Sequence, residues 1–293
     1  GLISFENEPY VMSEIDARDS DDVTLIFTIS SDASPGSSSG IIINLNSESS
    51  YSRSEVLELV IGEPQPVFFD DFENGIDNWQ LNGDWGLTEN AFSGLYALTD
   101  SPDGDYQEAQ QTIAQLTTDI NFQFVSNPFV KFNAKWDIEP NYDFIRFQAF
   151  IADSGWITLS GEYTEAGSGQ PAQPFGEHGY DDLQEDWVEE TIHLDYLDGI
   201  VVEGFRFIQT SDNFVEGDGF SIDNFQILGY PSGMIGDFNS DAVVDIYDIL
   251  GLADLLLFGN DPSQYQLFFC DFDSNGMLDI MDLLRLSNII LGF

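Results

Sequence analysis

Two acidic segments near the C-terminus carry the residue types and the spacing that a hard metal ion requires. The first starts at Asp237 and ends at Asp248, and the second starts at Asp271 and ends at Asp282. Each has an Asp or Asn at positions 1, 3, 5, 9 and 12 of a twelve-residue segment. Ca²⁺ takes about six to eight oxygen ligands, and a loop of this length can wrap them around one ion. The sequence therefore predicts two Ca²⁺ sites.

The segments have the spacing of an EF-hand loop, in which the backbone carbonyl of position 7 adds a further ligand. They start 34 residues apart and share the letters Asp-Phe-x-Ser at their first four positions. The alternative is a pair of Asp-rich turns in a very acidic chain, but chance rarely duplicates such a pattern. The predicted ligands are Asp237, Asn239, Asp241, Val243, Asp245 and Asp248 in the first loop and Asp271, Asp273, Asn275, Met277, Asp279 and Asp282 in the second.

An apolar pattern at helical spacing follows each loop. Its residues are Ile249, Leu252, Leu255 and Leu256 after the first loop and Leu283, Leu284, Leu286, Ile289 and Ile290 after the second. The first loop begins with the sequence Gly-Asp-Phe-Asn-Ser-Asp at residues 236–241, as dockerin loops do. With this start, the duplicated pattern over residues 235–293 resembles the type I dockerin family. The resemblance implies Ca²⁺-dependent folding, no helix ahead of either loop, and binding to a cohesin-like module on a scaffold or cell surface.

The chain departs from the family pattern in two places. Ala242 stands at position 6 of the first loop, where a Gly normally makes the sharp turn, so we expect weaker binding at that site. In the family, cohesin selectivity depends on loop positions 10 and 11 and on basic residues in the next helix, but the first helix here carries Asp254. The expected partner-binding residues are therefore apolar: Ile246, Tyr247, Ile280 and Met281.

The charge of the chain excludes several partners. Its 293 residues include 53 acidic and 7 basic side chains, which gives a net charge of −46. Such a field repels nucleic acid and anionic membranes and attracts divalent cations. No apolar run is long enough to span a bilayer. With 42% hydrophobic and 14% aromatic residues the chain is predicted to be globular, and its single cysteine, Cys270, is expected in a core.

The rest of the chain reads as β-structure. Alternating residues mark strands at Val23, Leu25, Phe27 and Ile29, at Ile41–Ile43, at Leu57, Leu59 and Ile61, and in the centre at Val130–Trp136, Ile145–Ile151 and Phe205–Phe207. Residues 32–36 read as a turn. We predict a partial immunoglobulin-like module at 1–61, a linker at 62–66, an antiparallel β-sandwich of jelly-roll type at 67–231, and a small α-helical EF-hand-like dockerin module at 232–293.

Residues 67–230 also resemble a family. The motifs lie, in order, at residues 71–75, 79, 84–88, 93–102, 136–139, 187–190, 205–207 and 221–224. They are similar to the MAM-like β-sandwich domains appended to secreted bacterial peptidases, such as immune inhibitor A proteases and some zinc carboxypeptidases. The resemblance implies that a hydrolase precedes this region in a longer protein, and a peptidase is the kind of hydrolase we expect. The start at Gly1 rather than Met agrees with a fragment or a processed product.

A further Ca²⁺ site is predicted inside the sandwich. The first and last strands of a jelly roll often lie side by side, which would bring Asp71 and Glu73 close to Asp223, with Asp100 arriving from a loop. Such a site would tie the ends of the sandwich together. The alternative is a set of exposed turn carboxylates.

Catalysis is not expected within these residues. Glu189 and Glu190 are adjacent in a predicted strand, so they face opposite sides and cannot form a glycosidase pair. No HExxH motif or nucleophile elbow is present. Among the tryptophans, Trp136 is expected in the core, whereas Trp85 and Trp156 are the better candidates for stacking on a sugar.

The sequence thus predicts the non-catalytic region of a secreted, extracellular or cell-surface protein, which binds Ca²⁺ and attaches to a cohesin-like partner. Extracellular modules of this type need more free Ca²⁺ than the cytosol offers. Two alternatives remain open. The region could be a carbohydrate-binding accessory part of a polysaccharide-degrading enzyme, or a structural protein that assembles with itself through its dockerin-like module.

Overall fold

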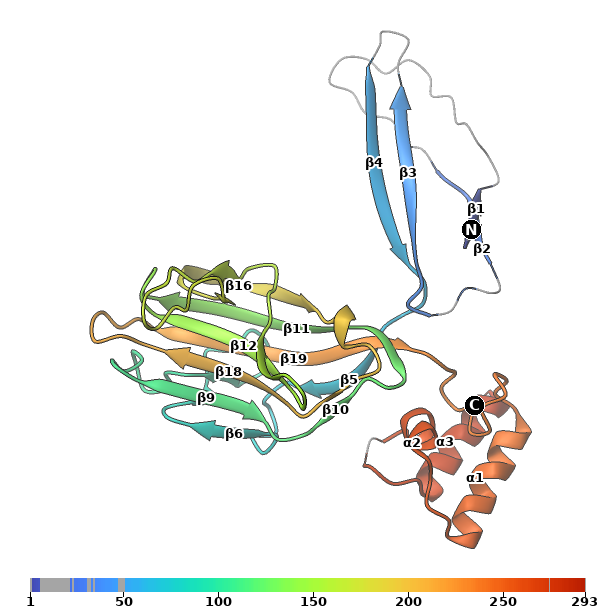
Figure 1. The fold of residues 1–293 in the computed structure, drawn as a ribbon. Coiled ribbons are helices and arrows are strands. Elements are labelled where there is room, and N and C mark those ends of the chain that lie inside the picture. The colour runs from blue at the N-terminus through green and yellow to red at the C-terminus, as the bar shows by residue number, and fades with distance from the viewer. Residues whose placement is uncertain are drawn as a thin grey trace. The chain divides into compact units, whose positions relative to one another are not determined.

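The computed structural model describes residues 2–5, 22, 24–30, 33, 35–46, 51–273 and 275–292. Val23, Asp32 and Ser34, which the sequence placed in a strand and a turn, lie outside the described residues. The chain divides into two compact units, Gly1–Glu63 and Pro64–Phe293. Strands make up both units, and the α-helices described lie at the C-terminal end of the second, in the orange and red part of the ribbon (Figure 1).

The first unit contains two antiparallel strand pairs. Strand β1 (Ile3–Phe5) pairs with β2 (Phe27–Ile29), and β3 (Ser38–Asn46) forms a hairpin with β4 (Ser52–Val60). The strands predicted around Ile41 and Leu57 are present, whereas Leu25 and Ile61 fall just outside β2 and β4. The immunoglobulin-like assignment of this unit stays a prediction.

The second unit is built on two facing antiparallel sheets, as expected for a jelly roll. The first sheet has the order β16-β11-β19-β8-β7, with β5 also paired to β19. Its strands are β5 (Gln65–Asp70), β7 (Gly86–Thr88), β8 (Ala97–Thr99), β11 (Val125–Ile138), β16 (Asp182–His193) and β19 (Gly219–Pro231). The second sheet has the order β13-β12-β18-β9-β6, with β6 (Trp79–Asn82), β9 (Gln111–Leu116), β12 (Phe144–Ile151), β13 (Gly155–Thr158) and β18 (Gly204–Thr210).

Short elements complete the sandwich at its edges. Strand β10 (Ile120–Asn121) pairs with β17 (Val201–Val202), and β14 (Glu165–Ala166) pairs with β15 (His178–Gly179). A 3₁₀ turn spans Asp195–Leu197. The predicted fold class is confirmed: the chain is mainly β, with a jelly-roll-like sandwich followed by short helices.

Alternate residues of both sheets point inward and form one aromatic core. The rings of Phe147 and Phe207 lie 4.6 Å apart, and Phe132 packs against Phe207 at 5.3 Å, between centroids. Trp136 is buried, as the sequence predicted, and so is Trp85, which cannot therefore stack on a sugar without unfolding. All five tryptophans lie in the sandwich, so their fluorescence reports on this part of the chain alone.

The boundaries of the sandwich differ from those predicted. Strand β5 begins at Gln65, inside the predicted linker 62–66, and Pro66 lies opposite Leu228 of β19. The linker prediction treated the two prolines as a stiff spacer, but a proline is tolerated on an edge strand because its missing N–H can face away from the sheet. The expectation that the first and last strands lie side by side is confirmed, since β5 pairs with β19.

The adjacent glutamates of β16 face opposite sides, as predicted. Glu189 is exposed and forms an ion pair with Lys131 at 2.6 Å. Glu190 is fully buried and accepts hydrogen bonds from the Tyr180 hydroxyl and the Glu162 N–H, at 2.9 and 2.7 Å. The two carboxylates therefore cannot act on one substrate.

Asp100 is a buried carboxylate in the turn after β8. Its Oδ1 accepts a hydrogen bond from the Phe220 N–H at 2.8 Å, whereas its Oδ2 is buried with no partner among the described residues. Burial raises the pKa of Asp100 from 3.8 to about 7. Because the folded state holds this proton more tightly than the unfolded chain, the contribution of Asp100 to stability falls as the pH rises from about 4 to about 7.

The Asp100→Asn variant should remove this pH dependence, because an amide stays neutral throughout. In calcium-free buffer we expect the variant to match the wild type near pH 4 and to be more stable at pH 8, by up to about 4 kcal/mol. Urea unfolding followed by tryptophan fluorescence measures the difference. Asp103→Asn, at an exposed position, is the control. A constant gap between wild type and variant from pH 4 to 8 would contradict the role assigned to Asp100.

Candidate metal centres

Each acidic loop leads into a helix, and a short third helix lies between them. The first loop precedes α1 (Ile246–Phe258), and the second precedes α3 (Ile280–Leu291). Helix α2 (Gln264–Cys270) ends at Asp271, the first residue of the second loop, so the expectation of no helix ahead of either loop is wrong for the second. The missed signal is a capping box, in which Ser263 and Gln266 bond to each other's backbone N–H.

The helical module has a small core of its own. Leu252 of α1 and Leu286 of α3 are fully buried, and Phe269 and Cys270 of α2 pack with them. Burial raises the pKa of the Cys270 thiol to about 12, with a further contribution from nearby carboxylates. Cys270 is therefore a core residue, as the sequence predicted, and not a nucleophile.

The first loop is folded around its own carboxylates. Asp237 Oδ1 accepts a hydrogen bond from the Asp241 N–H at 3.1 Å, and its Oδ2 accepts one from the Ala242 N–H at 2.9 Å. Asn239 donates from its side-chain amide to Asp241 Oδ2 at 3.0 Å. The side chains of positions 1, 3 and 5 thus meet on the inside of one turn. This is where a Ca²⁺ loop places its first three ligands.

The second loop repeats this arrangement 34 residues later. Asp271 Oδ1 accepts from the Asn275 N–H at 3.2 Å and its Oδ2 from the Gly276 N–H at 2.8 Å. Carboxylate oxygens of Asp271, Asp273 and Asp282 lie within 4.8 Å of one another. Since Ca²⁺–oxygen distances are about 2.3–2.6 Å, one ion can reach all three. The donor set is hard oxygen throughout, and the described residues of this loop fit Ca²⁺.

The last ligand of each loop also closes the loop and caps its helix. Asp248 is fully buried and accepts from the Phe238 N–H at 2.9 Å and from the Asp245 N–H at 2.7 Å. Asp282 does the same with the N–H groups of Phe272 and Asp279, at 2.8 and 2.9 Å. Each bond to the N-cap residue is half of a capping box. Position 12 therefore couples the metal loop to the start of the helix.

The other predicted ligands have backbone partners or offer a backbone carbonyl. Asp245 and Asp279, at position 9, accept hydrogen bonds from the N–H groups of Tyr247 and Met281 at 2.7 and 2.6 Å. Val243 and Met277, at position 7, have exposed side chains, so only their backbone carbonyls are suited to a metal. Asn275, at position 5, accepts from the Met277 N–H at 2.8 Å. The structure thus brings together positions 1, 3 and 5 in the first loop and positions 1, 3 and 12 in the second.

The electrostatics of the second loop favour a cation. Burial raises the pKa of Asp271, and the like charge of Asp282 adds to the shift, against opposing bonds from Gly276 and Asn275. None of the ion pairs in the described part of the chain involves a loop carboxylate. The charge that builds up in the loop is therefore left for a bound cation to neutralise.

Two of the four carboxylates predicted for a sandwich site come together. Glu73 Oε1 accepts from the N–H groups of Leu95 and Tyr96 at 2.7 and 2.8 Å, and Asp223 Oδ2 accepts from the Ser93 N–H at 2.9 Å. Both carboxylates thus hold the same short loop. Burial raises the pKa of Asp223, and the charge of Glu73 adds to it.

The other two carboxylates lie at different distances from this pair. Asp71 accepts a hydrogen bond from the Glu73 N–H at 3.3 Å and stays beside it. Asp100 bonds instead to Phe220, three residues from Asp223 along β19, which is about 10 Å in a strand. The sequence predicted the strands that meet but not their register, and the register separates Asp100 from Asp223.

The predicted partner-binding residues are all on the surface. Ile246, Tyr247, Ile280 and Met281 are 51%, 64%, 59% and 49% exposed. Their exposure leaves them accessible to a partner, and their role in partner binding stays a prediction.

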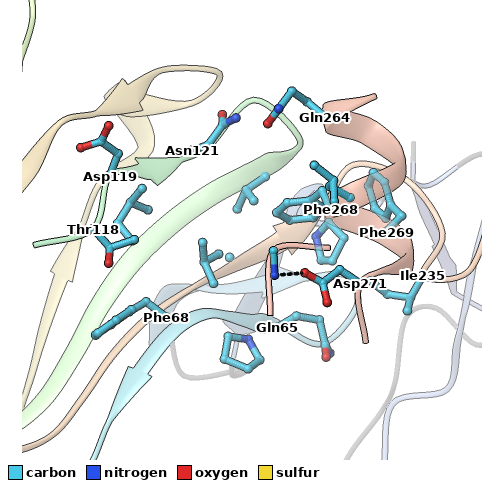
Figure 2. Close-up of a pocket in the computed structure, with 18 of the residues that line it drawn as sticks. Gln65, Phe68, Thr118, Asp119, Asn121, Ile235, Gln264, Phe268, Phe269 and Asp271 are labelled. Atoms are coloured by element: carbon cyan, nitrogen blue, oxygen red, sulfur yellow. Dashed lines mark hydrogen bonds between the residues drawn. The ribbon is translucent and has the colours of Figure 1, made fainter. Parts of the chain in front are cut away.

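The helical module rests on the sandwich through Phe124, which lies between β10 and β11. Its ring centroid is 5.4 Å from Tyr265 and 6.0 Å from both Phe268 and Phe269. A cavity of about 460 Å³ lies beside this contact, lined by Phe68 on the sandwich side and Phe268 on α2 (Figure 2). The contact uses α2, so the exposed residues at the starts of α1 and α3 stay free.

Comparison with known proteins gives the helical module a family. Residues 235–291 match the dockerin type I domain. Type I dockerin domains bind calcium, and their partners are cohesins. Among curated proteins, none matches the chain.

The sandwich has distant likenesses among solved structures. One is the CBM22-1 xylan-binding domain from Paenibacillus barcinonensis Xyn10C, at 14% identity and a TM-score of 0.34, covering 58% of this chain and 96% of that one. Another is the K3 cleaved adhesin domain of Lys-gingipain from Porphyromonas gingivalis, at 13% identity and a TM-score of 0.36, covering 57% and 99%. Scores this low carry no information on function.

Position 6 is the clearest difference between the two dockerin loops. Ala242 has a φ of +64° and Gly276 a φ of +81°, a region where a Cβ strains the backbone. A Cβ at Gly276 would meet no atom within 4 Å, so the cost of an alanine there is conformational alone. The first loop therefore stores strain that the second does not.

Exchanging these residues should exchange the affinities. Ala242→Gly should tighten Ca²⁺ binding at the first loop and Gly276→Ala should weaken it at the second, each by about 1 kcal/mol or about fivefold in Kd. Calorimetric titration of both variants and the wild type measures this. An unchanged Kd in both variants would show that position 6 does not limit either site.

Proposed function

We propose that this chain is the non-catalytic part of a secreted or cell-surface protein, in which the dockerin domain binds two Ca²⁺ ions and attaches the sandwich to a cohesin-like partner. The observation that carries the proposal is the duplicated loop, in which Asp248 and Asp282 make equivalent bonds to the start of their loop and of their helix.

Ca²⁺ binding would drive the folding of this domain. The two loops contain eight Asp residues, and the carboxylates of Asp271, Asp273 and Asp282 converge, with none of them in an ion pair in the described part of the chain. Without the ion these charges oppose the folded loop, whereas the bound ion turns their repulsion into attraction. Free energy of metal binding then becomes free energy of folding.

The exposed apolar residues of the dockerin domain supply the partner surface. Equivalent positions of the two repeats carry Ile246 and Ile280, Tyr247 and Met281, Leu250 and Leu284, and Leu257 and Leu291, all about half exposed or more. At protein interfaces a few well-buried anchor residues carry most of the binding free energy, and burial of apolar side chains contributes to it. A largely apolar cohesin contact fits these residues.

Single charges in this surface should weaken attachment without unfolding the domain. We expect Tyr247→Asp and Ile280→Asp each to weaken cohesin binding about tenfold or more, and EDTA to abolish it. Surface plasmon resonance against a panel of cohesin modules measures binding, with Phe69→Asp on the sandwich as the control, since Phe69 is similarly exposed. Binding that survives both dockerin variants would refute the proposed surface.

The other parts of the proposal concern what the dockerin domain attaches. We propose three domains, at 1–61, 67–231 and 232–293, with the start of the second moved to Gln65, where β5 begins. The second is a MAM-like sandwich, and the full-length protein also contains a hydrolase, namely a peptidase. The resemblance of residues 67–230 supports this. Self-assembly through the dockerin domain is the competing possibility. Light scattering with and without Ca²⁺ separates the two, because assembly gives larger species only when the domain is folded.

We also propose a third Ca²⁺ ion in the sandwich, held by Glu73 and Asp223 with Asp71 beside them. Glu73→Gln should then reduce the rise in sandwich melting temperature that Ca²⁺ produces, because one ligand charge is lost. Melting followed by tryptophan fluorescence isolates the sandwich, and Asp103→Asn serves as the control. If Ca²⁺ leaves the wild-type sandwich transition unchanged, there is no third site.

Among the helices described, none has the length and apolar character to cross a lipid bilayer.

A further inference from the structure

The outer face of the five-stranded sheet differs in charge from the rest of the chain. Strand alternation places fifteen residues on this face: Gln80, Asn82, Gln111, Ile113, Gln115, Phe144, Arg146, Gln148, Phe150, Trp156, Thr158, Gly204, Arg206, Ile208 and Thr210. None of them is acidic, although 53 of the 293 residues are. Two of the seven basic residues are there, and five carry side-chain amides.

The two arginines are neighbours in the sheet but have different partners. Arg146 forms an ion pair with Glu177 at 2.7 Å. Arg206 has no carboxylate partner among the described residues. Burial lowers the pKa of Arg206, and the nearby charge of Arg146 adds to the shift. Arg146 thus raises the positive potential around Arg206. Since Glu177 balances the charge of Arg146, the guanidinium that is open to a ligand is that of Arg206.

The guanidinium of Arg206 is held in a fixed plane. It lies over the ring of Trp156 at 3.8 Å from the centroid. Its Nε and Nη2 atoms both donate to Gln148 Oε1, at 2.9 and 2.7 Å. Gln148 in turn donates to the Thr158 hydroxyl at 3.0 Å, so its own orientation is set. One edge of the guanidinium is thus clamped, and its plane is fixed by the stack.

The opposite edge of Arg206 is open. Three of its five N–H bonds, two on Nη1 and one on Nη2, have no acceptor in the described part of the chain. Nη1 is not among the buried unpaired atoms, so it reaches solvent. The Nη1–Nη2 edge of an arginine matches the two oxygens of a carboxylate.

Polar side chains extend from Arg206 across the whole sheet. Gln80, Gln115, Arg206, Gln148 and Thr158 lie opposite one another on successive strands. At about 4.8 Å between strands, the row is about 19 Å long. Gln148 is buried and its amide is used by Arg206 and Thr158, and the Thr158 hydroxyl donates to Glu177. The side chains of the row that can take the hydroxyl groups of a sugar chain are therefore Gln115 and Gln80, next to Arg206. The Phe144 end of the face is covered by the loop at Gly179, whereas Gln80 is exposed.

We propose that this face binds a polysaccharide that contains uronic acid, with the carboxylate of one uronate on the open edge of Arg206 and sugar hydroxyls on the amides of Gln115 and Gln80. Gln148 and Trp156 are positioning residues that keep the guanidinium flat. The site does not involve the dockerin domain, and it would give the sandwich a ligand of its own.

The net charge of −46 opposes an anionic ligand only at long range. At about 0.15 M salt the screening length is about 8 Å, so the groups on this face itself govern close contacts. There the charge of Arg146 is balanced by Glu177, and the Arg206 guanidinium is left without a carboxylate from the residues described. Side-chain amides are both donors and acceptors, and so are sugar hydroxyls, which matches the amides beside Arg206 to a sugar chain.

The test is calorimetry on the full chain in 0.15 M NaCl with Ca²⁺, using tetramers of galacturonate, glucuronate and mannuronate and their methyl esters. We expect at least one acidic tetramer to bind and its neutral ester to bind about tenfold more weakly or not at all. Arg206→Gln should cause the same loss, and Arg206→Lys most of it, because an ammonium cannot make the two-pronged contact. Arg53→Gln, on the first unit, is the control.

Several results would overturn the proposal. These are no binding to any of the three tetramers, equal binding of acid and ester, or unchanged binding by Arg206→Gln with an unaltered tryptophan-fluorescence melting curve. Equal binding of acid and ester points to a neutral glycan site. Tighter binding of a poly-glutamate peptide than of every uronate tetramer would assign the face to a protein ligand instead. Arg206→Lys keeps the test valid if Arg206→Gln fails to fold.

Discussion

The C-terminal part of this structure depends on the mutual repulsion of buried carboxylates. Asp248 and Asp282 are fully buried, and each holds the beginning of its loop and the first turn of its helix. Such a residue is stable as an anion only when its hydrogen bonds and a nearby cation outweigh its loss of water. Under the proposed function, the two residues that close the loops and cap the helices would also make folding of the domain depend on a metal. Attachment to a partner would then depend on the Ca²⁺ concentration.

The sandwich is stabilised by apolar packing and not by clustered carboxylates. Its core is aromatic, and Phe147 and Phe207 pack at its centre. The strand residues on the outer face of the five-stranded sheet include no acidic side chain, and Glu177 reaches this face from a loop and pairs with Arg146. Phe124 joins the sandwich to α2 and leaves α1 and α3 exposed. The chain thus separates the face that would contact a cohesin from the face that would contact a ligand.

What the sequence predicts well is local. The twelve-residue loops and the alternation in β11 and β12 need only neighbouring residues, and the structure has them where expected. What it missed depends on register or on short elements. Asp100 was grouped with Asp223 because their strands meet, but the pairing of β8 with β19 moves it three residues away. Arg206, Gln148 and Trp156 are up to 58 residues apart, and only the sheet brings them together.

The proposed function requires that two metal ions bound by the duplicated loops fold the dockerin domain. The decisive measurement is calorimetric titration of Ca²⁺ into the full chain and into the Asp248→Ala/Asp282→Ala double variant, with circular dichroism at 222 nm. The double variant should bind two fewer ions than the wild type and gain no helix signal on addition of Ca²⁺, whereas the wild type should gain one. Equal numbers of bound ions, or a wild-type helix signal that Ca²⁺ does not change, would contradict it.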